Sequence, residues 1–179
     1  AGATGRSPLH MNSGLTYKDH LMKIGVIADT HLSRYDQGLA DAINRHFKDT
    51  DLVLHAGDVV DARALEVFSG LNLLLVSGNM DSPGIRDVSP VKRVISAGKF
   101  TLGLIHGWGA PDGIEERLIR EFGPLDALIY GHTHRASSGV KNGVLFFNPG
   151  SATDRRFAPF TSIGILDIGE EIKPYIILL

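Results

Sequence analysis

Short apolar runs alternate with stretches of helical periodicity in the first half of the chain. The runs are rich in aliphatic residues and predict three strands, at Lys23–Ala28, Leu52–His55 and Leu71–Val76. Between them, apolar residues spaced three and four apart predict an amphipathic helix over Gly38–Lys48, and a second short helix is predicted over Ala62–Ser69. Because the predicted strands are apolar nearly throughout, they are typical of a parallel sheet with both faces covered.

The second half of the chain has more strands and fewer helices. One helix is predicted over Ile114–Phe122. The predicted strands are Val91–Ile95, Phe100–Ile105, Leu125–Tyr130, Ser162–Ile168 and Ile172–Leu178, together with a hairpin over Val140–Asn148. The hairpin is predicted to turn at Lys141-Asn142-Gly143, because Asn-Gly supplies the positive φ angles of a tight turn. Strand–helix units followed by sheet-to-sheet connections predict an α/β fold class.

The composition is that of a soluble chain with a hydrophobic core. Hydrophobic residues make up 43% of the 179 residues and charged residues 21%, which fits a single domain. The net charge of -2 gives no general attraction to nucleic acid or to anionic membranes, so neither is expected as a partner. The chain has no cysteine, which excludes disulfides and thiolate metal sites and agrees with a reducing, cytoplasmic location.

The first 21 residues lack a pattern that predicts structure. The stretch Ala1–Met11 is small and polar, and no apolar segment of a signal peptide follows it. We expect residues 1–21 to be an expression tag or a flexible tail, with Met11 or Met22 as a natural start. Residues 22–179 are expected to form the folded domain.

Polar clusters begin where the predicted strands end. The five clusters are Asp29-Thr30-His31, Gly57-Asp58, Gly78-Asn79, His106-Gly107 and Gly131-His132-Thr133-His134. Because ligands of open α/β sheets bind outside the carboxyl ends of the strands, we expect these side chains to meet at one edge. Carboxylate oxygens and imidazole nitrogens ligate ions such as Mn, Fe or Zn, so the clusters predict a metal site.

The spacing within two clusters carries a geometric expectation. Asp29 and His31 would lie on the same side of an extended segment and reach one ion, and the same is expected of His132 and His134. The glycines beside the clusters are expected to let the backbone turn sharply at each strand end.

Each cluster also has an ordinary explanation when it is taken singly. Gly-Asp and Gly-Asn are common turn dipeptides, His106 could be a core histidine, and Gly-His-x-His by itself leaves the two explanations level. Turn formation does not require histidine four times at strand ends, so the set favours chemistry. His10, His20, His46 and His55 are not assigned to metal, and His55 is expected to pack or hydrogen-bond in the core.

In this order the five clusters, with Asp81 after Asn79, resemble the motifs of the calcineurin-like metallophosphoesterases. The compact length and the turn Asn148-Pro149-Gly150-Ser151 are similar to the small bacterial and archaeal phosphodiesterase branch. The resemblance covers residues 22–179. It implies a four-layer α/β/β/α sandwich of mixed sheets with two divalent metal ions above the sheet edge. Manganese is expected first, with iron, zinc, nickel and magnesium as alternatives.

The resemblance also implies a ligand set and a mechanism. The first ion would be held by Asp29, His31, Asp58 and His134, and the second by Asp58, Asn79, His106 and His132, with Asp58 as the bridge. A hydroxide that bridges the two ions would attack phosphorus in line with the leaving oxygen. Asp58, Asn79 and His106 are the catalytic residues that this pattern implies.

One position departs from the superfamily pattern. Most members resemble Gly-Asn-His-Asp or Gly-Asn-His-Glu at the third motif, where the histidine is thought to protonate the leaving group, whereas this chain has Met80. The small phosphodiesterase branch also lacks that histidine, so slow turnover of poor leaving groups is expected. Asp81 is interpreted as a carboxylate that accepts a hydrogen bond from a ligand histidine, with capping of the Ser82-Pro83 turn as the alternative.

Substrate contacts are suggested by three further segments. Asn148, Gly150 and Ser151 could present backbone N–H groups to a phosphate or form a structural turn, and the sequence leaves these readings level. Arg155 could bind phosphate oxygens, although exposed arginine pairs are usually solvated. Trp108 could form a pocket wall for a base or aryl group, with packing as the favoured alternative.

The combined expectation is a dinuclear-metal phosphodiesterase acting on small or nucleotide-like phosphodiesters. A non-catalytic scaffold, like the retromer subunit of this fold, is one alternative, and a phosphomonoesterase or a nuclease is another. The near-neutral charge disfavours a non-specific nuclease, which needs a basic track for the nucleic-acid backbone. The sequence leaves a homo-oligomer open.

Overall fold

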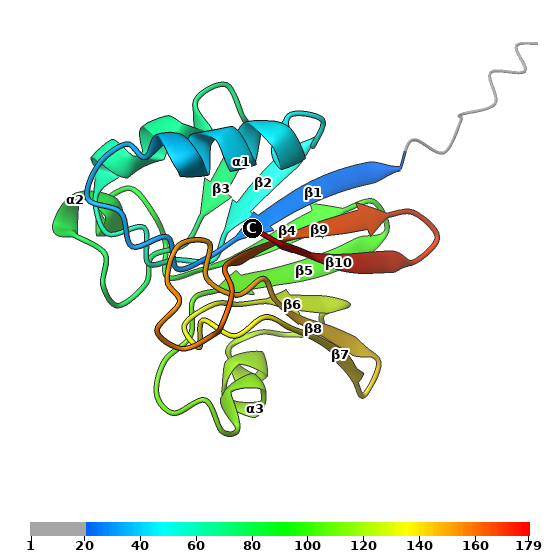
Figure 1. Ribbon diagram of the computed structural model, residues 1–179. Coiled ribbons are helices and arrows are strands. Elements are labelled where there is room, and N and C mark those ends of the chain that lie inside the picture. Colours follow the sequence, from blue (N-terminus) through cyan, green and yellow to red (C-terminus); the bar gives the residue numbers. More distant parts are fainter. Residues whose placement is uncertain (1–20) are drawn as a thin grey trace, which may run out of the picture.

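Two five-stranded mixed sheets pack face to face in the computed structural model, which describes residues 21–179. Helices cover the outer face of each sheet, so the chain forms the expected four-layer α/β/β/α sandwich (Figure 1). The predicted tail, apart from Leu21, lies outside the described residues. Among the described residues, no helix combines the length and the apolar character needed to cross a membrane.

The first sheet has the strand order β10-β9-β1-β2-β3. Its strands are β1 (Met22–Ile27), β2 (Leu52–His55), β3 (Leu73–Leu75), β9 (Ser162–Ile168) and β10 (Ile172–Leu178). The strands β1, β2 and β3 run parallel, whereas β9 is antiparallel to both β1 and β10. The outer face carries α1 (Gln37–Phe47) and the 3-10 helix η1 (Ala62–Phe68).

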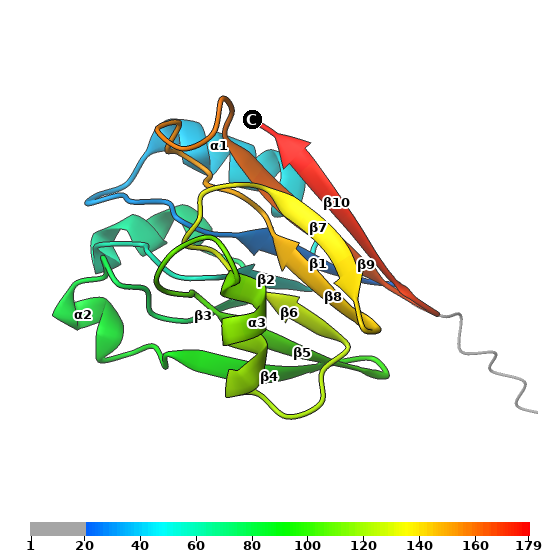
Figure 2. The ribbon, with the colours of Figure 1, turned by 90° about the horizontal axis from the view of Figure 1, so that it is seen from below.

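The second sheet has the strand order β4-β5-β6-β8-β7. Its strands are β4 (Lys92–Ala97), β5 (Phe100–Ile105), β6 (Ala127–Ile129), β7 (Ser137–Lys141) and β8 (Val144–Asn148). The strands β5, β6 and β8 are parallel, and the two edge strands are antiparallel to their neighbours. Its outer face carries α3 (Ile114–Leu118) and the 3-10 helix η2 (Ile119–Glu121), which lie in front of the sheet in Figure 2.

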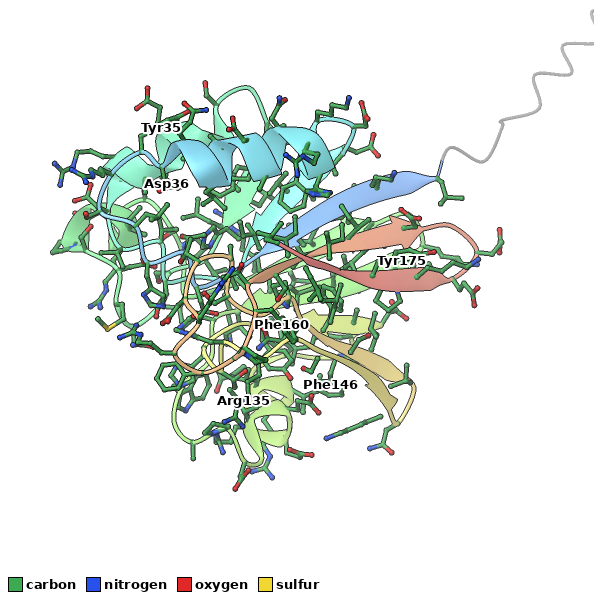
Figure 3. The ribbon with its side chains drawn as sticks, viewed as in Figure 1. Tyr35, Asp36, Arg135, Phe146, Phe160 and Tyr175 are labelled. Atoms are coloured by element: carbon green, nitrogen blue, oxygen red, sulfur yellow. The ribbon has the colours of Figure 1, made fainter. Side chains whose placement is uncertain are left out.

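Three layers of apolar side chains hold the sandwich together. Leu54, Leu104 and Phe147 belong to the core between the two sheets and are buried. A second cluster packs α1 and η1 on the first sheet, and a third packs Phe146 of β8 against α3 (Figure 3). Because the central strands of a covered sheet bury both faces, this arrangement accounts for the continuous apolar runs of the sequence.

Local sequence signals set the ends of the main helix. Asp36 is the N-cap of α1, where its carboxylate accepts a hydrogen bond from the Leu39 N–H at 2.8 Å (Figure 3). Gly25 of β1 leaves room for Phe47 at the other end, since a Cβ on Gly25 would lie 2.8 Å from the Phe47 ring. The predicted helix over Gly38–Lys48 is confirmed to within one residue at each end.

Several predicted elements are shorter or differently wound. The predicted strand over Leu71–Val76 is only Leu73–Leu75, and the predicted helix over Ile114–Phe122 is divided between α3 and η2. The hairpin turn is confirmed at Asn142 and Gly143, whose φ angles are 51° and 82°. Positive φ at both turn residues matches the right-handed twist of the flanking strands.

His55 of β2 is a buried core histidine, as the sequence suggested. Its Nδ1 atom accepts the Gly57 N–H at 3.2 Å, so its Nε2 atom carries the proton of the neutral ring and faces Thr30 Oγ1 at 3.1 Å. Burial lowers the pKa of His55 to about 3, and the nearby His106 adds to this effect.

We expect the His55→Gln variant to lose less stability in acid than the wild type. Because the folded pKa lies below the unfolded value of 6.5, the contribution of His55 is complete above pH 6.5 and is lost as pH falls toward 3. When the unfolded chain binds one proton more than the folded chain, the free energy of unfolding changes by about 1.4 kcal/mol per pH unit. Chemical denaturation between pH 6 and 4 measures the slope, with the half-buried His46→Gln as control. Equal slopes in wild type and His55→Gln contradict this assignment.

Candidate metal centre

The predicted polar clusters meet at one side of the sandwich. The parallel strands β1, β2 and β3 of the first sheet and β5 and β6 of the second end on this side, and the loops that follow them gather there (Figure 1). These loops supply the seven side chains that the sequence singled out. They are Asp29, His31, Asp58, Asn79, His106, His132 and His134.

The first part of the centre joins the β1 loop to the β6 loop. His31 Nε2 lies 3.0 Å from His134 Nε2, and His134 Nε2 lies 3.3 Å from Asp29 Oδ1. Asp29 is fully buried and also accepts the His132 N–H, with its Oδ2 atom at 3.0 Å. The ligand atoms of Asp29, His31 and His134 all lie within 4.8 Å of one another, which is a spacing that one ion can fill.

The second part joins the β2, β3, β5 and β6 loops. His106 Nε2 lies 3.3 Å from Asp58 Oδ2 and 3.2 Å from Asn79 Oδ1. His132 Nδ1 lies 3.1 Å from the same Asn79 oxygen. Asp29, Asp58 and His106 again lie within 4.8 Å of one another, so Asp29 belongs to both groups.

Both carboxylates lie between the two groups of histidines. Asp58 Oδ2 is 3.8 Å from His31 Nε2 and 3.3 Å from His106 Nε2, and Asp29 Oδ1 is 3.9 Å from each of these nitrogens. Distances alone therefore give Asp29 and Asp58 similar access to a shared ion. The bridging role of Asp58 stays a prediction from the family pattern.

The chemistry of the ring nitrogens fits a cation. His106 Nδ1 lies 2.8 Å from the Ala56 carbonyl, which only accepts, so Nδ1 carries the ring proton. In the neutral ring Nε2 is then a lone pair, and it faces the carboxylate oxygen of Asp58, which also only accepts. Two acceptor atoms that face each other with no hydrogen between them repel. They are stabilised when a second proton binds to the ring or when a metal ion lies between them. His132 is arranged in the same way, because its Nε2 atom lies 2.9 Å from the Gly109 carbonyl and its Nδ1 atom faces Asn79.

Burial and the neighbouring carboxylates act in opposite directions on the pKa values of these groups. Burial lowers the pKa of His106 and of His134, but hydrogen bonds and charges of Asp58 and Asp29 outweigh it, so both pKa values are raised. At His31 burial prevails and the pKa is lowered. Burial raises the pKa of Asp58, but its hydrogen bond with His106 and the charges nearby lower it overall. Asp58 is thus charged at neutral pH, as a metal ligand must be.

Backbone strain is concentrated in the same loops. Within residues 21–179, seven non-glycine residues have a positive φ, and five of them belong to the predicted ligand set. They are Asp29 (52°), His31 (44°), Asp58 (58°), His132 (70°) and His134 (57°). Each such residue costs of the order of 1–3 kcal/mol, so surrounding contacts must enforce the conformation, as they do at many functional sites. Hydrogen bonds from the Asp29 and His31 N–H groups to the Gly57 and Asp58 carbonyls, each 3.0 Å long, supply part of that enforcement.

Two local expectations were therefore wrong. Asp29 and His31 do not lie on an extended segment, and neither do His132 and His134, whose rings diverge toward different partners. Gly78 and Gly131 have no positive φ. They matter instead because they have no side chain, which leaves room for the carboxylates of the site. A Cβ on Gly78 would collide with Asp58 Oδ1, and one on Gly131 would lie 2.8 Å from Asp29 Oδ2. Gly57 and Gly107 do turn with positive φ, at 90° and 113°.

A family model described as the calcineurin-like phosphoesterase superfamily domain matches residues 22–171. The chain belongs to this superfamily. A probable metallophosphoesterase of Methanocaldococcus jannaschii is 35% identical over 162 residues, which are 87% of this chain and 81% of the relative. Members of the superfamily depend on divalent metal ions, and the side chains described above are suited to hold them.

Solved structures of similar proteins include an enzyme and a trafficking protein. A protein described as a novel archaeal phosphodiesterase superposes with a TM-score of 0.73 at 26% identity, covering 88% of this chain and 100% of its own. Vps29 of Entamoeba histolytica, solved in complex with zinc, superposes with a TM-score of 0.64 at 24% identity, covering 88% and 99%. The likeness to Vps29 concerns the fold.

In this phosphoesterase, Asp81 binds backbone rather than a ligand histidine. Its Oδ1 atom accepts the Val60 N–H at 2.6 Å, and its Oδ2 atom accepts the N–H groups of Gly78 at 2.7 Å and Asp58 at 3.2 Å. Ser82, not Asp81, is the N-cap of α2 (Pro83–Arg86). Asp81 therefore fixes the loops that carry Asp58 and Asn79 to each other, which neither reading of the sequence anticipated.

The turn after β8 uses its polar groups within the protein. Asn148 donates to the Gly131 carbonyl at 2.9 Å and accepts the Gly150 N–H at 2.9 Å, while Ser151 donates to the Asp29 carbonyl at 2.7 Å. Asn148, Gly150 and Ser151 are all buried, which favours the structural-turn alternative over a phosphate cradle. Arg155 is exposed and lines a cleft beside α1 together with Asp36 and Leu39, and none of the seven predicted metal ligands lines this cleft.

One feature of the phosphoesterase site escaped the sequence, and a second was only the less favoured of two alternatives. Asp154 Oδ2 lies 3.1 Å from His134 Nδ1, which makes no aligned hydrogen bond among the described residues, and Arg156 forms an ion pair with Asp154. The only signal for Asp154 was its place beside the arginine pair. A cleft of about 390 Å³ adjoins Asn79 and His106, and it is lined by Trp108 and Arg86 among others. Trp108 thus lines a cleft rather than packing in the core.

Proposed function

We propose that the protein is a dinuclear-metal phosphodiesterase that hydrolyses small or nucleotide-like phosphodiesters. The observation that carries the proposal is the convergence of two buried carboxylates, an amide and four imidazoles whose lone pairs face one another. Similarity to a protein described as an archaeal phosphodiesterase supports diesters over monoesters. Manganese as the native metal and a cytoplasmic location belong to the same proposal.

The residues divide into two ligand sets that share one carboxylate. Asp29, His31, Asp58 and His134 would hold the first ion, and Asp58, Asn79, His106 and His132 the second. When bound, two divalent ions activate a water molecule and offset the negative charge of a phosphate ester. Because the site contributes two carboxylates against two divalent ions, it retains positive charge that attracts an anionic ester.

The protein holds these ligands in place before substrate arrives. The Ala56 carbonyl fixes the tautomer and the ring orientation of His106, and the Met80 N–H donates to Asp58 Oδ1 at 2.7 Å. Asp81 ties the Asp58 loop to Gly78, next to Asn79. Outer contacts of this kind orient metal ligands and raise their affinity for the ion. The Met80 side chain has no group that can donate a proton, so the chain offers no leaving-group acid at that position.

An assay of two chromogenic esters tests the proposal. The metal-loaded protein is expected to hydrolyse bis(p-nitrophenyl) phosphate faster than p-nitrophenyl phosphate, to lose activity after chelation and to regain it with Mn²⁺. Hydrolysis that persists without metal contradicts the proposal, and a preference for the monoester selects the phosphomonoesterase alternative. Residual metal is measured by elemental analysis in every sample.

The Vps29 likeness supports a non-catalytic alternative in which the surface of the fold binds partner proteins. Vps29 of Entamoeba histolytica was solved with zinc, so metal binding by itself does not separate a scaffold from an enzyme. In this chain every position of the ligand set carries a side chain that can bind a metal, including Asn79. Absence of turnover with Mn²⁺, Zn²⁺ and Ni²⁺ in a protein that binds two ions selects the scaffold.

A further inference from the structure

A cleft opens directly beside the second half of the metal centre. It has a volume of about 390 Å³, and Asn79 and His106 form part of its wall. The other lining residues come from β5, α2 and the loops around them, and they are Ser77, Gly78, Arg86, Val91, Ile105, Gly107 and Trp108. A phosphoester whose phosphate group is bound at the metal centre would therefore place one of its two ester substituents near this cleft.

The wall of the cleft combines an aromatic face with one positive charge. Trp108 is 43% exposed although it lies next to buried His106, so its ring is open to a ligand. Val91 and Ile105 add apolar surface, and none of the lining residues is acidic. A planar group can stack on tryptophan, and this contact tolerates different bases because every base has a π-face.

Arg86 supplies the positive charge and is held in place by the backbone. Its guanidinium donates to the Asn79 carbonyl at 2.7 Å, and it forms no ion pair within residues 21–179. The remaining N–H groups of its planar fork are available for phosphate oxygens, which they can bind in pairs. The cleft thus brings an aromatic surface and an anion-binding group together with Asn79.

We infer that this cleft selects phosphoesters with a nucleobase on one ester substituent. The base stacks on Trp108, Arg86 binds oxygens of the phosphate group, and the phosphorus lies over Asn79 and His106. This inference rests on the proposed function and names its substrate class. It gives Trp108 a role in specificity, whereas a metal site alone would accept any accessible diester.

The test compares binding of adenosine 5′-monophosphate and ribose 5-phosphate, which carries an anomeric hydroxyl in place of the base. Trp108 is the single tryptophan of the chain, so its fluorescence reports directly on the cleft. We expect the nucleotide to quench this fluorescence and to bind about tenfold more tightly than ribose 5-phosphate in Mn²⁺-loaded protein. Equal affinities, or no quenching at millimolar nucleotide, overturn the inference.

Variants separate the two roles by calorimetry. Trp108→Ala is expected to reduce nucleotide affinity to that of ribose 5-phosphate, and Trp108→Phe to restore most of the difference. Arg86→Gln is expected to weaken both ligands by roughly tenfold and to keep their ratio. Tyr175, which is 48% exposed on the edge strand β10 (Figure 3), provides the matched control Tyr175→Ala. Arg120, which is exposed on η2, provides the control Arg120→Gln.

The outcome is distinguishable from a failure of the proposed function. Binding is measured without turnover, so the result does not depend on hydrolysis. If the protein binds the nucleotide more tightly than ribose 5-phosphate and this difference in affinity disappears in Trp108→Ala, the inference is supported even in a protein that hydrolyses no diester. Conversely, a protein that hydrolyses diesters but binds the nucleotide and ribose 5-phosphate with equal affinity keeps the proposed function and removes the inference. A ratio that survives in Trp108→Ala places the base elsewhere and also removes it.

Discussion

Replacement of Asp58 by asparagine is expected to lower kcat/KM for bis(p-nitrophenyl) phosphate roughly a thousandfold, since metal ions contribute several kcal/mol to such reactions. The substitution keeps the shape of the side chain and removes its negative charge. In the wild type this carboxylate lies within 4 Å of both His31 and His106, and its pKa is lowered overall. A neutral amide at this position would hold neither ion as firmly.

Measuring the metal content shows whether activity is lost because the variant binds its metal ions less tightly. If Asp58 is the bridge, Asp58→Asn retains fewer ions per chain than Asn79→Ala, because Asn79 contributes to the second ion alone. The matched control is Asp49→Asn, an exposed carboxylate between α1 and β2, near the end of β2 opposite to the metal centre. Full activity in Asp58→Asn contradicts the proposed site, and an equal loss in Asp49→Asn points to a general effect on folding.

The wild-type enzyme is expected to hydrolyse aryl diesters at least about 100-fold faster than alkyl diesters of similar size, the lower range of what a general acid contributes. An aryl oxide leaves without a proton, whereas an alkoxide needs one. The position of the family histidine is occupied by Met80, whose side chain is 58% exposed and has no N–H or O–H group. Protonation of the leaving oxygen is therefore left to solvent.

A pair of variants at this position provides the comparison. Met80→His is expected to raise kcat on the alkyl diester and to leave the aryl rate within a few-fold, while Met80→Leu changes neither. The measurement is kcat for a series of diesters with leaving groups of increasing pKa. A series whose kcat does not depend on the leaving-group pKa would show that the chain has another proton donor.

Most of the secondary structure was predictable because it depends on neighbours in the sequence. Apolar runs identified β5, β9 and β10 to the residue, and the Asn-Gly pair located the hairpin turn. The predictions were less accurate where tertiary contacts shorten or tighten an element. β3 is cut to three residues, and the helix predicted over Ala62–Ser69 is a 3-10 helix, η1.

By itself the sequence determined the residue types and the strand ends that carry them. Parallel strands bring their carboxyl ends to one edge, so the meeting of Asp29 and Asp58, which follow β1 and β2, resulted from the order of the elements. The tertiary structure decided how these residues meet. The hydrogen bonds of Asp81 join the loops after β2 and β3. Left-handed backbone at Asp29 and His134 and the cleft between Arg86 and Trp108 depend on loops from both sheets. These loops lie far apart in the sequence, and only the packing of the two sheets sets the distances between them.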